Sequence, residues 1–285
     1  PATGNRAQAL GYPAMQLLIE RAMSHQESFA LSEAELPLAI DICQRLDGIP
    51  LAIELVAAQI ERFGLPGLLV QMEDNFRLLT RGRRTALPRQ QTLRATLDWS
   101  FDLLTECEQI CLRRLAVFRG GFSLVSAAAV IAGEQMAPAE VLGSITQLVA
   151  KSLLNVEASD DEMVYRLLDI TRTYALEKLS HASELPATRE RHAARCLALM
   201  EQAQGDWDLI ATQPWIDRYA PLREDVRAAL DWGFADGGAQ LLAIRLTVSA
   251  MPLWQELSLL REHGGYVDQA LALIDQVTAP CTQLT

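Results

Sequence analysis

Apolar positions recur at helical spacing through most of this chain, and residues 11–79 show the pattern throughout. Residues 39–46 carry one such apolar stripe, which follows Ser32 and Glu35 at the spacing of a capping box. A stretch rich in Gly and Pro at 64–67 interrupts the pattern further on. We therefore expect a bundle of four short helices within residues 1–79.

Two short strand-like runs, at 152–156 and 163–167, replace the helical pattern in the middle of the chain. An acidic loop at 157–162 joins them. The helices expected around this hairpin cover residues 90–104, 105–117, 123–132, 138–151 and 169–179. This order of helices, hairpin and closing helix is typical of a winged helix, which we expect within residues 80–180.

The chain returns to a helical pattern after Ser183. Helices are expected near residues 189–204, 222–234, 240–255 and 259–274. Their lengths suit helix-turn-helix units and resemble the opening of a TPR-like array, although no clean repeat period can be scored. The expected fold class is mainly α: a helical lid bundle over 1–79, a winged helix with a small β-hairpin over 80–180, and TPR-like antiparallel helices over 181–285.

A corner between two expected helices is the segment most informative about chemistry. Gly48 suits a left-handed helix stop, and Pro50 suits the first position of the next helix. Gly followed closely by Pro also commonly marks the turn between two helices in any helical bundle. Taken alone, these residues are therefore compatible with a plain helix corner.

Composition excludes several classes of protein. Half of the 285 residues are apolar, which is ample for buried cores, and no apolar run is long enough to span a bilayer. The five cysteines are scattered, and Cys107 and Cys111 have no third metal ligand near them in sequence. We expect a cytoplasmic protein with no disulfide framework, no metal site and no membrane contact.

Charge argues against direct binding of nucleic acid. The net charge is −11, and the helix expected at 138–151 has no Arg or Lys before Lys151. Because a helix that reads a DNA groove usually carries cationic and amide side chains, we expect this winged helix to contact protein and not nucleic acid. The basic run at 81–84, continued by Arg89 and Arg94, is either a solvated linker or a patch facing phosphates or acidic groups.

Four blocks resemble, in order, segments of the NB-ARC-type signal-transducing ATPases, the STAND class, as found in bacterial transcriptional regulators. LDGIPLAIEL at 46–55 is similar to the Gly-x-Pro-Leu segment of the helical lid. RATLDWSFDLL at 94–104 and LAVFRGGF at 115–122 are similar to the winged-helix segment. YRLLDITRTYA at 165–175 occupies the place of the Met-His-Asp motif.

The resemblance implies half of a nucleotide site. In that family the lid proline touches adenine, and the winged-helix motif reads the phosphates of ADP. Carried over, this places Pro50 against the base, Gly48 in the turn that delivers it, and Asp169 in the latch. The family's histidine position is Leu168, which can neither donate a hydrogen bond to phosphate nor carry charge.

The sequence has no Gly-Lys pair, so the P-loop motif does not occur anywhere in it. It also lacks an apolar strand ending in paired acids, which would hold magnesium. We therefore expect no catalytic residues and no enzyme activity in this chain. ADP or ATP would bind only together with an upstream nucleotide-binding domain, from which we expect this chain to be a downstream fragment.

Two hypotheses of function follow. The first is a regulatory segment of a STAND-type transcriptional regulator, which couples the ADP or ATP state of its own upstream nucleotide-binding domain to the helical array, where a protein or small-molecule signal binds. The second is a non-catalytic helical adaptor, whose acidic surface and several tryptophans bind a protein partner. An upstream P-loop in the encoding frame would distinguish the two.

Overall fold

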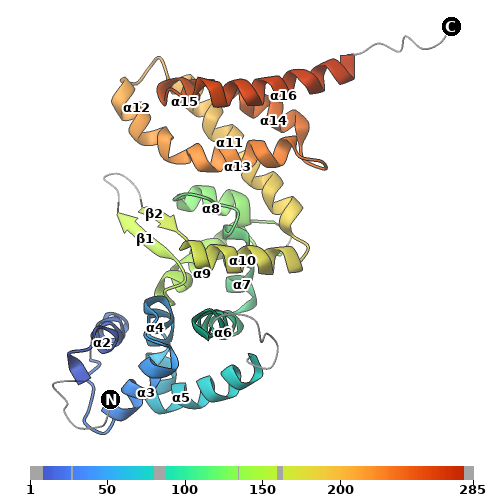
Figure 1. Cartoon of the computed structure of the whole chain (residues 1–285). Coiled ribbons are helices and arrows are strands. Elements are labelled where there is room, and N and C mark those ends of the chain that lie inside the picture. Colours follow the sequence, from blue (N-terminus) through green and yellow to red (C-terminus); the bar gives the residue numbers. More distant parts are fainter. Residues whose placement is uncertain (1–8, 27, 80–87, 134, 159–162, 279–285) are drawn as a thin grey trace. The chain divides into compact units, whose positions relative to one another are not determined.

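The computed structural model describes residues 9–26, 28–79, 88–133, 135–158 and 163–278 (Figure 1). The chain divides into two compact units, Pro1–Gln109 with Gly143–Asn155, and Ile110–Leu142 with Val156–Thr285. Most of the described residues are helical, and the only named strands among them form one hairpin. The predicted mainly α fold class is thus confirmed, while the three domain boundaries stay a prediction.

The first unit contains the four helices expected before residue 80. They are α2 (Pro13–His25), α3 (Leu36–Arg45), α4 (Pro50–Ala57) and α5 (Ile60–Leu79), followed by α6 (Pro88–Asp102). The expected break at 64–67 is a kink within α5, where Gly64 has a φ of +62°. The capping box is present, since the Ser32 N–H and hydroxyl both donate to the Glu35 carboxylate.

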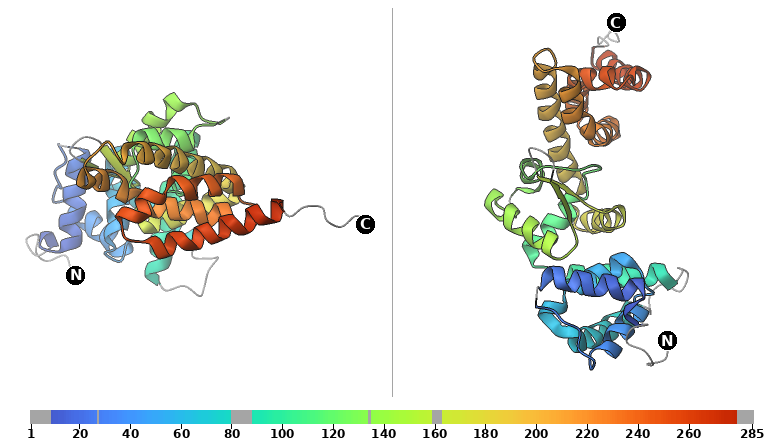
Figure 2. Two further views of the ribbon diagram at one scale, coloured as in Figure 1. Left: turned by 90° about the horizontal axis from the view of Figure 1, so that it is seen from above. Right: turned by 90° about the vertical axis from the view of Figure 1, so that its left-hand side faces the viewer.

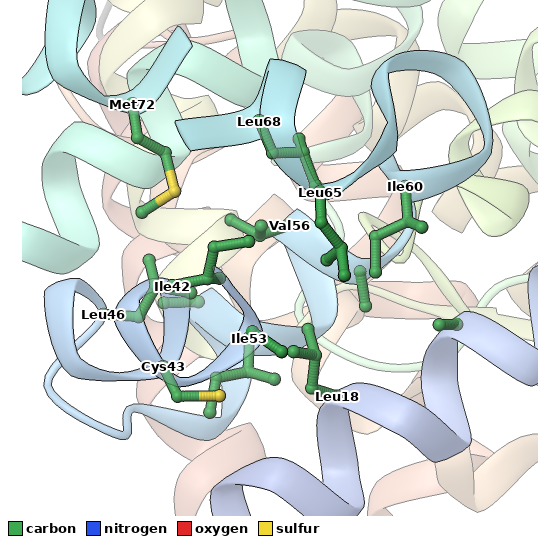
Figure 3. Close-up of a cluster of buried hydrophobic side chains, with 14 of the residues drawn as sticks. Leu18, Ile42, Cys43, Leu46, Ile53, Val56, Ile60, Leu65, Leu68 and Met72 are labelled. Carbon is green, nitrogen blue, oxygen red and sulfur yellow. The ribbon is translucent and has the colours of Figure 1, made fainter. Parts of the chain in front are cut away.

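The core of this unit is made by the apolar stripes of all these helices. Leu18 of α2, Ile42 of α3 and Ile53 of α4 point toward Leu68 and Met72 of α5 (Figure 3). Each of these five side chains is almost completely buried. The helical period read from the sequence is therefore the period of the buried face.

The second unit contains part of the winged-helix segment together with the C-terminal helices. Its elements include α8 (Leu124–Ile131), β2 (Met163–Arg166), α10 (Asp169–His181), α11 (Leu185–Asp206), α12 (Thr212–Tyr219), a 3₁₀ turn (Ala220–Leu222), α13 (Arg223–Phe234), α14 (Gln240–Ser249), α15 (Met251–Glu256) and α16 (Leu260–Thr278). The long helix α11 packs on α8 and α10 and also on α13 and α14 (Figure 2). Helix α11 therefore contacts both the winged-helix part of this unit and its C-terminal helices.

The C-terminal helices differ from the expected set in two places. The short helix α12 was not predicted, and the single helix expected at 240–255 is two helices, α14 and α15. Pro252 lies in the first turn of α15, where a residue without an N–H suits a new helix start and not a continuing one. A TPR-like repeat in this array stays a prediction.

Two of the four tryptophans in the array are completely buried, while Trp207 and Trp232 are half-buried. Trp215 and Trp254 are 1% and 0% exposed, and the Trp215 indole N–H donates to the carbonyl of Ala203 at 2.8 Å. The adaptor hypothesis used the tryptophans as surface contacts. These two serve the core, which removes part of its support.

Across the described ranges, no helix is both long enough and apolar enough to cross a membrane.

Candidate functional site

The corner between α3 and α4 has the geometry that its sequence predicts. Gly48 has a φ of +64°, and its N–H donates to the carbonyl of Cys43 at 3.1 Å. No atom would lie within 4 Å of a Cβ at this position, so the backbone angle and not lack of space calls for glycine. Pro50 is the first residue of α4 and follows an extended Ile49.

The corner is exposed and held in place. Gly48 and Pro50 are both exposed to solvent. The Thr92 hydroxyl of α6 donates to the Asp47 carboxylate at 2.8 Å, which ties the corner to a second helix. The geometry agrees with a plain helix corner, and its exposure leaves Pro50 open to a contact from outside this unit.

Asp169 lies in the second unit, as the first residue of α10. Its carboxylate is 94% exposed and lies 3.8 Å from Nε of Arg172. A carboxylate in the first turn of a helix is favoured by the helix dipole whether or not it binds a ligand. The three predicted site residues therefore fall in different units, with Gly48 and Pro50 in one and Asp169 in the other.

The segment from α7 to α10 contains a strand position that the sequence pattern did not predict. The order along the chain is α7 (Glu106–Leu115), Phe122, α8, α9 (Pro138–Ala150), β1 (Asn155–Ala158), β2 and α10. Phe122 and Tyr165 each donate a backbone N–H to the other's carbonyl at 2.9 Å, so Phe122 pairs with β2. A Cβ on Gly121 would lie 2.5 Å from Cγ1 of Val164, which explains the glycine before it.

The exposed positions of α9 carry one charged side chain, Glu140, among uncharged ones. Val141, Ile145 and Leu148 are buried, while Thr146 and Gln147 are exposed. The other exposed positions of this helix are Pro138, Ala139, Glu140, Leu142, Gly143 and Ala150. The Gln147 amide can hydrogen-bond to base edges, and the small residues Ala139, Gly143 and Ala150 are exposed on the same helix.

An ionic cluster joins α7 to the start of α11. Glu184 accepts hydrogen bonds from Nε of Arg113 at 2.9 Å and Nε of Arg114 at 2.6 Å. Burial alone raises the pKa of Glu184, but the two guanidinium groups outweigh it and hold this pKa below its ordinary value. Arg114 also donates to the carbonyl of Ile131, which connects the cluster to α8.

A second buried cluster centres on Asp225 of α13. Its Oδ1 accepts from the backbone N–H of Arg119 at 2.7 Å, and its Oδ2 accepts from that of Gly120 at 3.3 Å. His192 of α11 also lies against it. Burial favours the neutral imidazole, but Cys196 and the Asp225 carboxylate together raise the pKa of His192 to about 10. The imidazole is therefore a cation at neutral pH.

Sequence reasoning missed both clusters. Arg113 and Glu184 are 71 positions apart, and His192 and Asp225 are 33 apart. No local spacing rule links such residues. Buried polar side chains on otherwise apolar faces, such as His192 between Thr188 and Cys196, were the available signal.

Comparison with known families identifies the middle segment. Residues 104–180 match the family model of the winged helix-turn-helix domain. The chain contains a winged-helix domain. Within the matched residues the first helix is α7, whereas the sequence pattern placed the helix at 90–104 first. The hairpin of β1 and β2 and the closing helix α10 are as the sequence pattern predicted.

Two mycobacterial proteins match most of this chain. They are "Putative HTH-type transcriptional regulator Rv0890c" of Mycobacterium tuberculosis (strain ATCC 25618 / H37Rv) and "Putative HTH-type transcriptional regulator Mb0914c" of Mycobacterium bovis. Each is 40% identical over 259 residues, which is 90% of this chain but 29% of the relative. "Uncharacterized protein Rv0894" of M. tuberculosis is 41% identical over 180 residues, 63% of this chain and 46% of that protein. The chain thus spans less than half the length of these relatives.

The prediction that this winged helix makes no direct contact with nucleic acid is contradicted by these matches. The domain is of the helix-turn-helix type, and relatives that align along most of the chain are named HTH-type transcriptional regulators. The prediction rested on the net charge of −11 and on the lack of cationic side chains at 138–151. Base edges are also read by uncharged hydroxyl, amide and methyl groups, which the exposed Thr146 and Gln147 supply. The acidic loop residues at 159–162 and the basic run at 81–84 lie outside the described residues.

Proposed function

We propose that this chain is the DNA-binding segment of a transcriptional regulator and that α9 of its winged helix enters the major groove of duplex DNA. The match of residues 104–180 to the winged helix-turn-helix domain carries this proposal. The relatives named as HTH-type transcriptional regulators support it.

The exposed face of α9 suits base readout. The Gln147 amide has the donor and acceptor that pair with the N6 and N7 edge of adenine, and Thr146 has a methyl group that contacts the thymine methyl. Ala139 and Gly143 lie on the exposed surface of the same helix, where their small size permits close approach to a groove. Arg166 is exposed at the end of β2, and an exposed guanidinium group is suited to contact with a phosphate.

The test is selection of duplexes from a random pool by the 285-residue chain, followed by fluorescence anisotropy of the selected duplex. The proposal predicts one enriched sequence class that binds more tightly than the unselected pool, with an affinity that falls as salt rises. Equal affinity for selected and unselected duplexes would contradict base readout. No binding to either would contradict the whole proposal.

We further propose that the helical bundle within residues 1–79 couples DNA binding to a nucleotide. In this proposal, a STAND-type nucleotide-binding domain outside this chain holds ADP or ATP, Pro50 contacts the adenine, Gly48 shapes the turn, and Asp169 serves as the latch. The exposure of Gly48, Pro50 and Asp169 supports it. Such a regulator would act in the cytoplasm, and this segment itself would be no enzyme.

The nucleotide proposal is tested by ADP binding to the full-length product of the encoding reading frame. The change Pro50→Ala should weaken ADP binding, because it removes the ring that covers the adenine. Pro186→Ala, an exposed proline in the first turn of α11, is the matched control and should leave the affinity unchanged. If the full-length product binds no ADP, or if Pro50→Ala binds it as tightly as the parent, the nucleotide proposal is wrong, and the DNA-binding proposal is unaffected.

A further inference from the structure

A pocket of about 250 Å³ lies within the second unit, where the end of α7 and helices α10, α11 and α13 meet. Its apolar walls include Val117, Leu176, Ala229 and Trp232. The pocket does not involve Gly48, Pro50 or the exposed face of α9. The functions proposed above therefore leave it unexplained.

Three arginines line this pocket. They are Arg119 from the loop after α7, Arg172 from α10 and Arg189 from α11. Among the residues that the structure describes, the one carboxylate that lines it with them is Asp231, which accepts a hydrogen bond from the Tyr266 hydroxyl at 2.9 Å. His192 also lines it, but its charge is balanced by Asp225. Positive charge therefore exceeds negative charge around the pocket.

The charge of Arg172 is poorly compensated. Its side chain is 15% exposed, and its carboxylate neighbour Asp169 is 3.8 Å away and almost fully in water. Its Nε is buried and has no hydrogen-bond partner among the described residues. A guanidinium group that is largely removed from water is unfavourable unless an anion pairs with it.

The other two arginines are also available to an anion. In the described part of the chain, neither the Arg119 nor the Arg189 side chain makes an ion pair within 4 Å. The backbone N–H of Arg119 is fixed by Asp225, so its loop is held beside the pocket while its side chain stays exposed. Guanidinium groups bind phosphate oxygens through pairs of charge-assisted hydrogen bonds.

We propose that this pocket binds a small phosphomonoester. The phosphate lies among Arg119, Arg172 and Arg189, where it supplies the anion that Arg172 lacks. The carbon skeleton lies against Leu176 and Trp232, and Asp231 accepts a hydrogen bond from a ligand hydroxyl. The volume is below the usual range of about 300–1,000 Å³ for pockets that take drug-sized ligands, which favours a ligand of pentose phosphate size.

The test is isothermal titration calorimetry of the 285-residue chain with ribose 5-phosphate, inorganic phosphate and ribose, all at one ionic strength. Saturable binding of ribose 5-phosphate, weaker binding of phosphate and no binding of ribose are expected. The Trp232 indole should report the same event by a change in fluorescence. Arg119→Gln and Arg189→Gln should each weaken ribose 5-phosphate binding about tenfold.

Arg261→Gln is the matched control, because Arg261 is exposed on α16 and does not line the pocket. It should bind ribose 5-phosphate like the parent. The proposal is overturned if ribose 5-phosphate does not bind, if ribose binds equally well, or if the pocket variants and Arg261→Gln have the same affinity. It is also overturned if a short DNA duplex displaces the sugar phosphate, since the arginines would then be contacts to the DNA backbone. Unchanged circular dichroism of Arg119→Gln separates loss of binding from loss of fold.

Discussion

Nε2 of His192 lies 2.9 Å from Oδ1 of Asp225, and both side chains are almost completely buried. The same carboxylate accepts the backbone N–H groups of Arg119 and Gly120. Asp225 of α13 thus contacts both α11 and the loop that follows α7. This contact fixes the C-terminal helices to the winged-helix part of the second unit.

Asp225→Asn should lower the free energy of unfolding by about 3 kcal/mol, because it leaves the His192 charge buried without its counter-ion. Urea unfolding followed by circular dichroism measures the change. Asp208→Asn, the same substitution at an exposed position, should stay within about 0.5 kcal/mol of the parent. Equal stabilities of the two variants would show that the Asp225 contacts add nothing to the fold.

The lowered pKa of Glu184 predicts how the free energy of unfolding depends on pH. Its pKa is lowered in the folded state from an ordinary value of 4.5 by Arg113 and Arg114, against the opposing effect of burial. A depressed carboxyl pKa stabilises the fold above pH 4.5, and this stability is lost as the pH falls through the folded-state pKa. Unfolding free energies measured from pH 6 to pH 3 should therefore fall.

In Glu184→Gln this acid-induced loss should be smaller, and the variant should already be less stable at pH 6, because two arginines lose their carboxylate. Glu190→Gln, on the exposed surface of the same helix, should keep the parent profile. If the unfolding free energy of Glu184→Gln changes with pH in parallel with that of the parent over the whole range, Glu184 does not cause the loss of stability in acid.

The helical framework was predictable because it depends on local patterns. Residues within one or two helical turns determine each of three predicted features. These are the apolar stripe at 39–46, the capping box of Ser32 and Glu35, and the helix end at Gly48. The division of 240–255 into two helices was missed, although Pro252 was visible in the sequence. The apolar pattern continues across Pro252, so periodicity alone does not show where α15 begins.

The site was less predictable because its contacts are non-local or uncharged. Phe122 pairs with Tyr165 of β2 as a single bridge residue and not as part of a strand. A single residue produces no alternating hydrophobic pattern, so the sequence does not reveal this pairing. The nucleic-acid prediction was wrong for a different reason: it relied on the net charge and on the lack of cationic side chains at 138–151, and uncharged groups that can contact bases do not enter such a count.

Two glycine substitutions should shift stability in opposite directions. Gly48→Ala places a Cβ at a φ of +64° and should lower the free energy of unfolding by about 1 kcal/mol. Gly143→Ala lies in α9 with no atom within 4 Å of the new Cβ and should raise it by about 0.5–1 kcal/mol. Thermal unfolding of both variants measures this. A shift of the same sign in both would contradict the assigned backbone conformations.

The proposed reading of DNA by the exposed face of α9 is tested by fluorescence anisotropy of the selected duplex with Gln147→Glu and with the control Gln204→Glu, an exposed glutamine of α11. Both variants add one negative charge to an exposed helix surface. We predict that Gln147→Glu weakens binding at least about tenfold, because it loses an amide contact and faces DNA with a carboxylate, while Gln204→Glu binds like the parent. Equal affinities of the two variants for this duplex would contradict the claim.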